Sequence, residues 1–346
     1  MIVEEKYMRR AIQLAKNGIE NASPNPMVGA VIVCNGKIIG EGYHRRCGEG
    51  HAEVNAVASV KDKNLLQQST IYVTLEPCSH YGKTPPCAQL IIDNKIPNVV
   101  IGSLDPFEKV SGRGVKMLQD AGINVITGVL ESDCKALNPR FIKAHSLKRP
   151  FITLKWAQSL DGFIDINRNI TETPAKISTD ITSMLVHKIR SHHDAIMVGS
   201  ETIIRDNPRL NNRLWSGRNP IIVVADRRMR IPADAQIFSY SPIYLSPQKR
   251  EDLPCDTKWI KIPENATISN YLELLYNSGI TSLLVEGGSN LLQAFINSGL
   301  WDIARIETSP IKFHEKGDKK APQIHCNTHS ESIIDNNKIT YLVNDI

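Results

Sequence analysis

Apolar positions in the first 127 residues follow two patterns, helical spacing and short continuous runs. Helical spacing predicts a first helix that can end at Gly18, with an apolar face made of Tyr7, Met8, Ala11, Ile12, Leu14 and Ala15. Two apolar runs at 28–34 and 37–42 are joined by Asn35-Gly36, which predicts a β-hairpin because both residues tolerate positive φ. The pattern then predicts helices at 51–60, 87–94 and 112–121 and strands at 71–75, 99–102 and 124–127. Apolar strands separated by helices indicate a sheet that is covered on both faces.

A second α/β region follows a stretch at 143–150 that has no apolar periodicity and is predicted to be a linker. Its predicted elements are helices at 179–191 and 289–298 and strands at 151–156, 195–199, 221–225, 282–286 and 303–308. Residues 229–270 give no assignable pattern, and the tail after about 325 is polar and rich in Asn. We therefore expect two α/β domains, 1–146 and 150–346.

Composition agrees with two folded domains. The 346 residues are 41% hydrophobic and 22% charged, which excludes intrinsic disorder. The chain has no apolar run of roughly 18 residues and no signal peptide at its start, so we expect a soluble, cytoplasmic protein without a membrane partner. The net charge of +5 is spread over interspersed signs, which disfavours a nucleic-acid partner. Seven cysteines, an odd number, favour metal binding or catalysis over a disulfide framework.

The most informative residues form a candidate metal site. His51-Ala52-Glu53 is followed by Glu76-Pro77-Cys78 and then by Cys87. His and Cys are ligands that zinc prefers, and three protein ligands leave a fourth position for water. Zinc lowers the pKa of such a water to about 7, and Glu53 near the start of a helix can move the proton without binding the metal.

This order matches the H-x-E and P-C-x-x-C signature of zinc nucleobase deaminases, except in one spacing. Eight residues separate Cys78 from Cys87, where the signature has two. The alternative is that His51 lies in the core and that the cysteines are small buried apolar residues. The remaining cysteines have no partner spacing and are expected to be spectators: Cys34, Cys47, Cys134, Cys255 and Cys326.

Four stretches resemble the deaminase half of the bifunctional riboflavin-biosynthesis deaminase/reductase family: SPNPMVGAVIV (23–33), GEGYH (40–44), HAE (51–53) and TLEPCSHYGKTPPC (74–87). The resemblance implies a cytidine-deaminase-like, three-layer α/β/α domain with zinc on His51, Cys78 and Cys87 and with Glu53 as the proton shuttle. The implied substrate is a diaminopyrimidinone that carries a ribose phosphate. Asn25 would contact its ring, and His44 and Lys83 would lie near its phosphate.

The second half resembles the reductase half of the same family, which has a dihydrofolate-reductase-like α/β fold. The stretches that carry this resemblance are KWAQSLDG (155–162) and Glu286-Gly287-Gly288, where two glycines lead from a strand into a helix. The resemblance implies substrate contacts from Lys155, Arg190, Leu210, Arg213 and Glu286. It also implies an NADPH site made of Ala157, Thr202, Asp206, Gly288, Ser289, Asn290, Leu291, Leu292, Gln293 and Ala294, and it favours a homo-oligomer formed through this domain.

One segment of the second half departs from the family pattern. The family has a Gly-Glu-Ser-x-Trp-Ile-Ser/Thr-like stretch, whereas this chain has Pro174 and Lys176 at the Ser and Trp positions. Arg227-Arg228 can favour the 2′-phosphate of NADPH or form an exposed pair. Three rival interpretations stay open: a nucleic-acid base deaminase, a deaminase whose second half is a dimerisation scaffold, and a metal-storage or regulatory protein.

Overall fold

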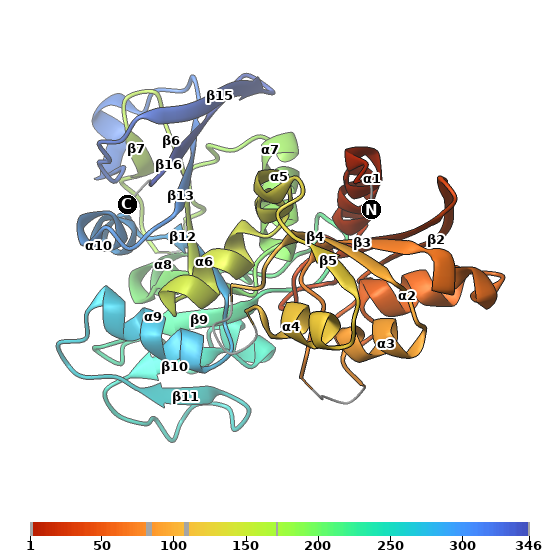
Figure 1. Ribbon diagram of the computed structural model, residues 1–346. Coiled ribbons are helices and arrows are strands. Elements are labelled where there is room, and N and C mark those ends of the chain that lie inside the picture. The colour runs from red at the N-terminus through yellow and green to blue at the C-terminus, as the bar shows by residue number, and fades with distance from the viewer. Residues whose placement is uncertain (1–2, 81–84, 107–110, 171, 345–346) are drawn as a thin grey trace. The chain divides into compact units, whose positions relative to one another are not determined.

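The computed structural model describes residues 3–80, 85–106, 111–170 and 172–344 (Figure 1). The chain divides into two compact units, one ending at Leu147 and the other beginning at Lys148. None of the helices in these ranges is long and apolar enough to span a membrane.

The first unit is built from a mixed sheet and helices on both of its faces. Its strands are β1 (Gly29–Cys34), β2 (Lys37–Tyr43), β3 (Thr70–Leu75), β4 (Asn98–Ser103) and β5 (Asn124–Ile126), in the order β2-β1-β3-β4-β5. Its helices are α1 (Glu5–Ala15), α2 (Ala52–Ser59), α3 (Cys87–Asp93), α4 (Arg113–Asp120), α5 (Glu131–Leu137) and α6 (Pro139–Leu147). The β1–β2 turn has positive φ at both Asn35 and Gly36, as the hairpin prediction requires.

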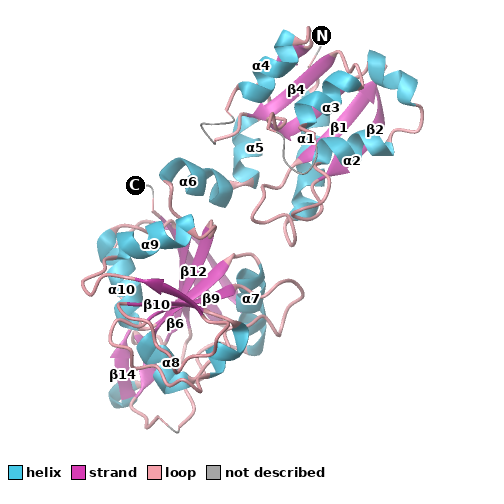
Figure 2. Ribbon diagram, turned by 90° about the horizontal axis from the view of Figure 1, so that it is seen from below, coloured by secondary structure: helices cyan, strands magenta, loops and turns pink. Residues whose placement is uncertain are grey.

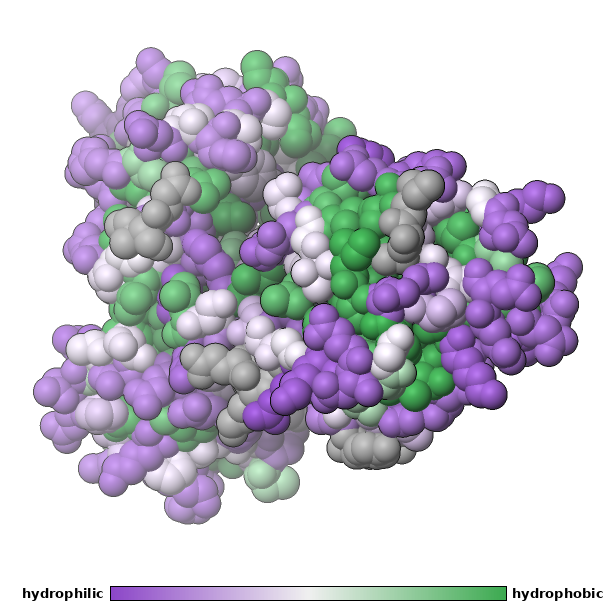
Figure 3. Space-filling view, in the orientation of Figure 1, coloured by the Kyte–Doolittle hydropathy of each residue, from purple (hydrophilic) through white to green (hydrophobic). Residues whose placement is uncertain are grey.

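Two apolar clusters make this unit a three-layer structure. Side chains of α2, α3 and α4 pack on one face of the sheet, and those of α1 and α5 pack on the other. Figure 2 shows α2, α3 and α4 together on one side of the strands. On the face shown in Figure 3, hydrophobic residues gather over the region of β4 and β5. The expected sheet with helices on both faces is therefore present.

The second unit contains a nine-stranded sheet in the order β11-β10-β9-β8-β12-β6-β13-β16-β15. Its strands are β6 (Phe151–Gln158), β8 (Ala195–Gly199), β9 (Ile221–Ala225), β10 (Ile243–Ser246), β11 (Lys258–Lys261), β12 (Ser282–Gly287), β13 (Ile303–Thr308), β15 (Thr328–Ile334) and β16 (Asn337–Val343). A separate two-stranded sheet pairs β7 (Phe163–Ile166) with β14 (Gly317–Lys320). The helices are α7 (Asp180–Ser191), α8 (Ser200–Asp206), α9 (Ile268–Asn277) and α10 (Ser289–Ser298).

The large sheet is parallel except at one end. The strands from β11 to β13 are parallel to their neighbours, whereas β16 is antiparallel to both β13 and β15. One face of the sheet packs against α9 and α10, and the other face holds a second apolar cluster that includes residues of α8. The carboxyl ends of β6, β8 and β12 lead toward the same edge, where a ligand can bind.

One sequence expectation was wrong here, and two stretches to which no element was assigned are folded. Residues 143–147 belong to helix α6, and Arg149 is bound to buried Asp302 by two hydrogen bonds of 2.7 and 2.9 Å, so 143–150 is not a free linker. The unassigned region 229–270 contains β10, β11 and the start of α9. The polar tail forms the β15–β16 hairpin and extends the large sheet.

Candidate active sites

The candidate metal site of the first unit lies where three elements begin or end. Residue His51 caps the N-terminus of α2, Cys87 is the first residue of α3, and Cys78 follows the end of β3. His51 Nδ1 lies 3.6 Å from Cys78 Sγ and 3.3 Å from Cys87 Sγ. All three ligand atoms lie within 4.8 Å of one another, so they can share one ion.

The chemistry of these donors fits zinc. One imidazole nitrogen and two sulfurs are the set used by zinc sites that keep an open fourth position. The backbone N–H of Cys87 donates to Cys78 Sγ over 3.2 Å. A hydrogen bond from the Cys87 thiol and another from His51 lower the pKa of Cys78 despite burial, so its sulfur favours the thiolate that a metal needs.

A buried carboxylate, Glu53, lies in the first turn of α2 beside these donors. Only 3% of the surface of Glu53 is exposed to solvent. Burial, followed by the nearby Cys78 thiolate, raises the pKa of Glu53 to about 7. A carboxyl group of this kind both accepts and returns a proton near neutral pH.

The carboxylate of Glu76 has a structural task that sequence reasoning missed. It accepts four backbone N–H groups, from Asp105 (3.2 Å), Gly112 (3.0 Å), Gly114 (2.9 Å) and Val115 (3.2 Å). Three of these groups, those of Gly112, Gly114 and Val115, lie at the start of α4, whose first N–H groups have no partner within the helix. Glu76 therefore fixes α4 against the strand end that carries Cys78.

Two of the predicted substrate residues contact each other near the metal ligands. His44 Nδ1 lies 3.3 Å from the carbonyl oxygen of Gly50, which assigns the ring hydrogen to Nδ1. Asn25 Nδ2 then donates to His44 Nε2 over 3.2 Å. The His44 and His51 ring centroids are 5.4 Å apart, and burial lowers the pKa of His44, so its ring is neutral at pH 7. The third predicted residue, Lys83, lies outside the described residues.

A cleft of about 1080 Å³ opens in the second unit at the carboxyl ends of β6, β8 and β12. Most residues predicted to bind substrate or NADPH line it: Lys155, Ala157, Thr202, Asp206, Glu286, Gly288, Ser289, Asn290, Leu291, Leu292 and Ala294. The predicted cofactor residue Gln293 does not. Its side chain instead exchanges hydrogen bonds with the backbone of Gln323 over 2.8 and 3.1 Å.

Two further predicted substrate residues are paired with each other. The Arg190 guanidinium donates to both carboxylate oxygens of Glu286, each over 2.7 Å. Burial opposes ionisation of Glu286, but Arg190 and Lys155 outweigh it and lower the pKa of this carboxyl to about 2. Glu286 is therefore an anion at neutral pH.

A second, smaller cavity of about 400 Å³ brings together three predicted substrate-binding residues, Arg190, Leu210 and Arg213. Arg209, which sequence reasoning missed, also lines it. Three guanidinium groups in one cavity suit a phosphate, since Arg presents planar donors to its oxygens.

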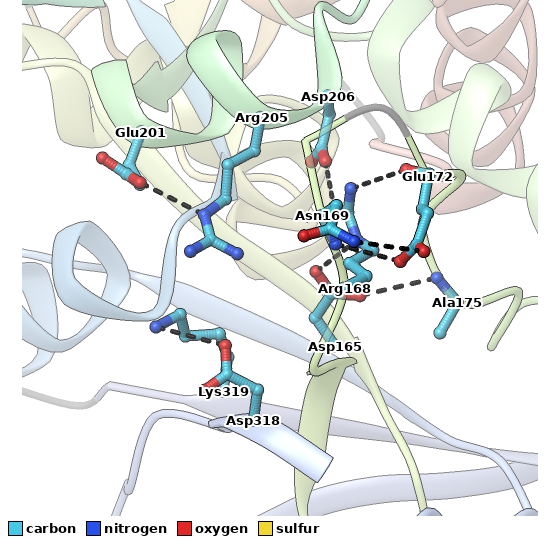
Figure 4. A network of polar contacts seen from close by, with 10 residues as sticks. All are labelled: Asp165, Arg168, Asn169, Glu172, Ala175, Glu201, Arg205, Asp206, Asp318 and Lys319. Atoms are coloured by element: carbon cyan, nitrogen blue, oxygen red, sulfur yellow. Dashed lines mark hydrogen bonds and ion pairs between the residues drawn. The ribbon is translucent and has the colours of Figure 1, made fainter. Parts of the chain in front are cut away.

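The segment that departs from the family pattern is held by a polar network (Figure 4). The side chain of Arg168 forms ion pairs with Asp165 and Asp206 and donates to the Glu172 carbonyl over 3.0 Å. Asp206, a predicted cofactor residue, is therefore engaged by Arg168. Pro174 and Lys176 do line the cleft, and the exposed Lys176 pairs with Asp180 over 2.8 Å.

Two family descriptions match the chain, one for each unit. The cytidine and deoxycytidylate deaminase zinc-binding region matches residues 1–103. The RibD C-terminal domain matches residues 150–320. The chain thus joins a zinc-binding deaminase domain to a RibD-type C-terminal domain.

Known proteins resemble the chain over most of its length. The riboflavin biosynthesis protein RibD of Actinobacillus pleuropneumoniae is 40% identical over 306 residues, which are 85% of this chain and 80% of that protein. The RibD of Aquifex aeolicus is 36% identical over 315 residues, with 89% and 87% covered.

Solved structures agree with these relatives. RibD of Acinetobacter baumannii is 32% identical, with a TM-score of 0.88 and 98% of each chain covered. The diaminohydroxyphosphoribosylaminopyrimidine deaminase/5-amino-6-(5-phosphoribosylamino)uracil reductase of Thermotoga maritima is 36% identical, with a TM-score of 0.85 and the same coverage. This chain therefore belongs to the RibD family, and the fold class expected from the sequence is confirmed.

Proposed function

We propose that the chain catalyses two successive steps of riboflavin biosynthesis, hydrolytic deamination in the first unit and NADPH-dependent reduction in the second. The substrate is the diaminopyrimidinone that carries a ribosylamino 5′-phosphate. The observation that carries this proposal is the convergence of His51, Cys78 and Cys87 beside the buried carboxyl of Glu53. Family membership supports both activities and both cofactors, zinc and NADPH.

In the first step the exocyclic 2-amino group leaves as ammonia, and the oxygen of water replaces it. Zinc held by His51, Cys78 and Cys87 would supply hydroxide near neutral pH. Glu53 accepts a proton from the water and delivers it toward the substrate nitrogen and the leaving amine, which its pKa of about 7 allows. Asn25, oriented by neutral His44, holds the pyrimidine ring.

In the second step the ribosyl group becomes ribityl. NADPH would supply a hydride to the sugar carbon attached to nitrogen, and the ring oxygen that leaves this carbon would take a proton. Glu286, Lys155 and Arg190 hold the sugar, and Arg190 also lines the small cavity that takes the phosphate.

The cleft of the second unit would hold the cofactor. The N-terminus of α10 at Gly288 and Ser289 would offer backbone N–H groups to the diphosphate. Arg227 and Arg228 line the same cleft, and no carboxylate of the described residues lies within ion-pair distance of either. These two cations suit the 2′-phosphate of NADPH.

Two further expectations belong to this proposal. The homo-oligomer through the second unit is supported by the exposed edge strand β15, whose unpaired backbone can join another strand. The cytoplasmic location stays a prediction.

The rival interpretation keeps deamination and makes the second unit a scaffold. Pro174 and Lys176 favour it. The paired Arg190 and Glu286, together with a polar cleft that contains Lys155, favour reduction.

Paired variants test the assignment of the two sites. Glu53→Gln should keep zinc but reduce ammonia release by about 10²–10⁴-fold, because an amide cannot move the proton. It should still oxidise NADPH when given the deaminated intermediate. Lys155→Ala should show the reverse pattern, with normal ammonia release. A loss of ammonia release of only about twofold in Glu53→Gln, measured where deamination limits turnover, would remove Glu53 from the role of shuttle.

A further inference from the structure

A buried ion pair lies next to the reductase cleft on strand β13, formed by Arg305 and Glu307. Arg305 is 1% exposed and Glu307 is fully buried. The parallel pairing of β13 with β6 places Arg305 directly beside Lys155 and Glu307 beside Ala157. Because neighbours in register share one face of a sheet, the pair lies on the same face as Lys155.

The contacts of this pair fix the carboxylate more firmly than the guanidinium. Arg305 Nη1 lies 3.5 Å from Glu307 Oε2. Glu307 Oε1 accepts a hydrogen bond of 2.7 Å from Asn337 of β16, whose amide also donates to the carbonyl of Ile177 over 3.2 Å. Within the described residues, Arg305 Nε and Nη1 have no hydrogen-bond partner.

Stability alone does not account for such a pair. Burying two charges costs free energy that their attraction often fails to recover, and apolar residues of similar size commonly serve a core as well or better. An arginine with buried N–H groups that lack acceptors adds to this cost. The pair therefore points to a role in the neighbouring site, where charged groups are arranged for chemistry.

The charges around Lys155 come from three elements. Glu286 lies on β12, Arg190 on α7, and Arg305 and Glu307 on β13. Burial lowers the pKa of the Lys155 amine, Arg190 and Arg305 lower it further, and the two carboxylates raise it. The β13 pair thus contributes one charge of each sign.

We propose that Arg305 and Glu307 are positioning residues of the reductase, which set the charge state of the Lys155 amine from the neighbouring strand. Neither touches substrate or cofactor; both act through Lys155. This inference rests on the proposed role of Lys155 in reduction. It also gives the C-terminal hairpin a function, because Asn337 of β16 holds Glu307 in place.

The test follows the pH dependence of reduction, measured as kcat/KM for the deaminated intermediate at saturating NADPH. Arg305→Met removes a cation, so the limb of the pH profile that reports the titration of Lys155 should move to higher pH. Glu307→Gln removes an anion, and the limb should move to lower pH. Each shift should be about one to three pH units, the range for unit charges about 4–12 Å apart at an effective dielectric constant of about 20. The direction is the same whether the protonated or the neutral amine is active.

The double variant and two controls separate this role from a structural one. Arg305→Met/Glu307→Gln should return the limb close to its wild-type position, which a simple packing defect would not do. Lys338→Met removes a charge from an exposed ion pair with Glu331 on the same hairpin and should leave the limb in place. Ammonia release by the first unit reports the amount of protein in every sample, and the fluorescence of the four tryptophans, all in the second unit, reports the folding of that unit.

The outcomes are distinct. If wild-type protein reduces the intermediate and Lys155→Ala does not, the proposed role of Lys155 stands. Limbs that coincide in wild type, Arg305→Met and Glu307→Gln would then overturn the positioning role alone. If Arg305→Met does not fold, Glu307→Gln still decides the matter, because an unmoved or upward-shifted limb contradicts the proposal.

Discussion

Replacing Glu76 by Ala should loosen the start of helix α4 and weaken the first unit. Hydrogen bonds to a charged group contribute about 1.5–3 kcal/mol each. Glu76 accepts four of them. The four share one carboxylate and are not additive, so we expect a loss of about 3–5 kcal/mol in the free energy of unfolding. The space around Gly114 leaves little room for adjustment, since a Cβ there would come within 2.1 Å of the Pro77 carbonyl oxygen.

Hydrogen–deuterium exchange read by mass spectrometry measures this loss locally. A loss of about 3 kcal/mol should accelerate exchange of the α4 amides by roughly 10²-fold. All four tryptophans, Trp156, Trp215, Trp259 and Trp301, lie in the second unit. Their fluorescence during denaturation should therefore be the same in Glu76→Ala and wild type.

A matched control uses another glutamate of the same unit. Glu131 forms an exposed i,i+4 ion pair with Lys135 over 2.7 Å, and Glu131→Gln should change stability by less than about 1 kcal/mol. Exchange of α4 in Glu76→Ala within about threefold of the wild-type rate would refute the reasoning, because the four N–H groups would then not depend on the carboxylate.

Three further variants test the cofactor sites. Cys78→Ala and Cys87→Ala should each lower the zinc content measured by elemental analysis, because each leaves only two of the three protein ligands; full retention in both proteins would exclude this site. Arg227→Ala/Arg228→Ala should raise KM for NADPH by about tenfold or more and leave KM for NADH nearly unchanged. The reason is that charge-assisted hydrogen bonds to a phosphate contribute about 1.5–3 kcal/mol, and NADH lacks the 2′-phosphate. An equal change in KM for both coenzymes would place the 2′-phosphate elsewhere.

Local signals in the sequence predicted most elements of the fold correctly. The hairpin at Asn35-Gly36, the helix that begins after His51 and the strands with apolar runs are all present. The β15–β16 hairpin was missed, although its turn has positive φ at Asp335 and Asn336. No sequence pattern predicted an element in this Asn-rich tail, whereas its asparagines supply part of the turn and Asn337. The capping box of α9 was also missed, because Asn270 stands where Glu or Gln is usual.

The candidate sites were predictable only where the residue type itself carries the chemistry. His51, Cys78 and Cys87 were identified because few other residues bind zinc. The task of Glu76 depends on N–H groups about 30–40 positions away, which no local pattern reveals. No sequence pattern distinguishes Arg305 and Glu307 from other charged residues in a predicted strand. Only the pairing of β13 with β6 places Arg305 beside Lys155 and Glu307 beside Ala157.

The central claim is that one chain performs both reactions. The most direct measurement is to incubate the zinc-loaded protein with the diaminopyrimidinone ribose phosphate, with and without NADPH, and to identify the products by mass spectrometry. Without NADPH we expect ammonia and a product in which a carbonyl oxygen replaces the amino group. With NADPH we expect the same product carrying two additional hydrogens on the opened sugar. Release of ammonia without any oxidation of NADPH, even from the deaminated intermediate, would contradict the account and support a scaffold role for the second unit.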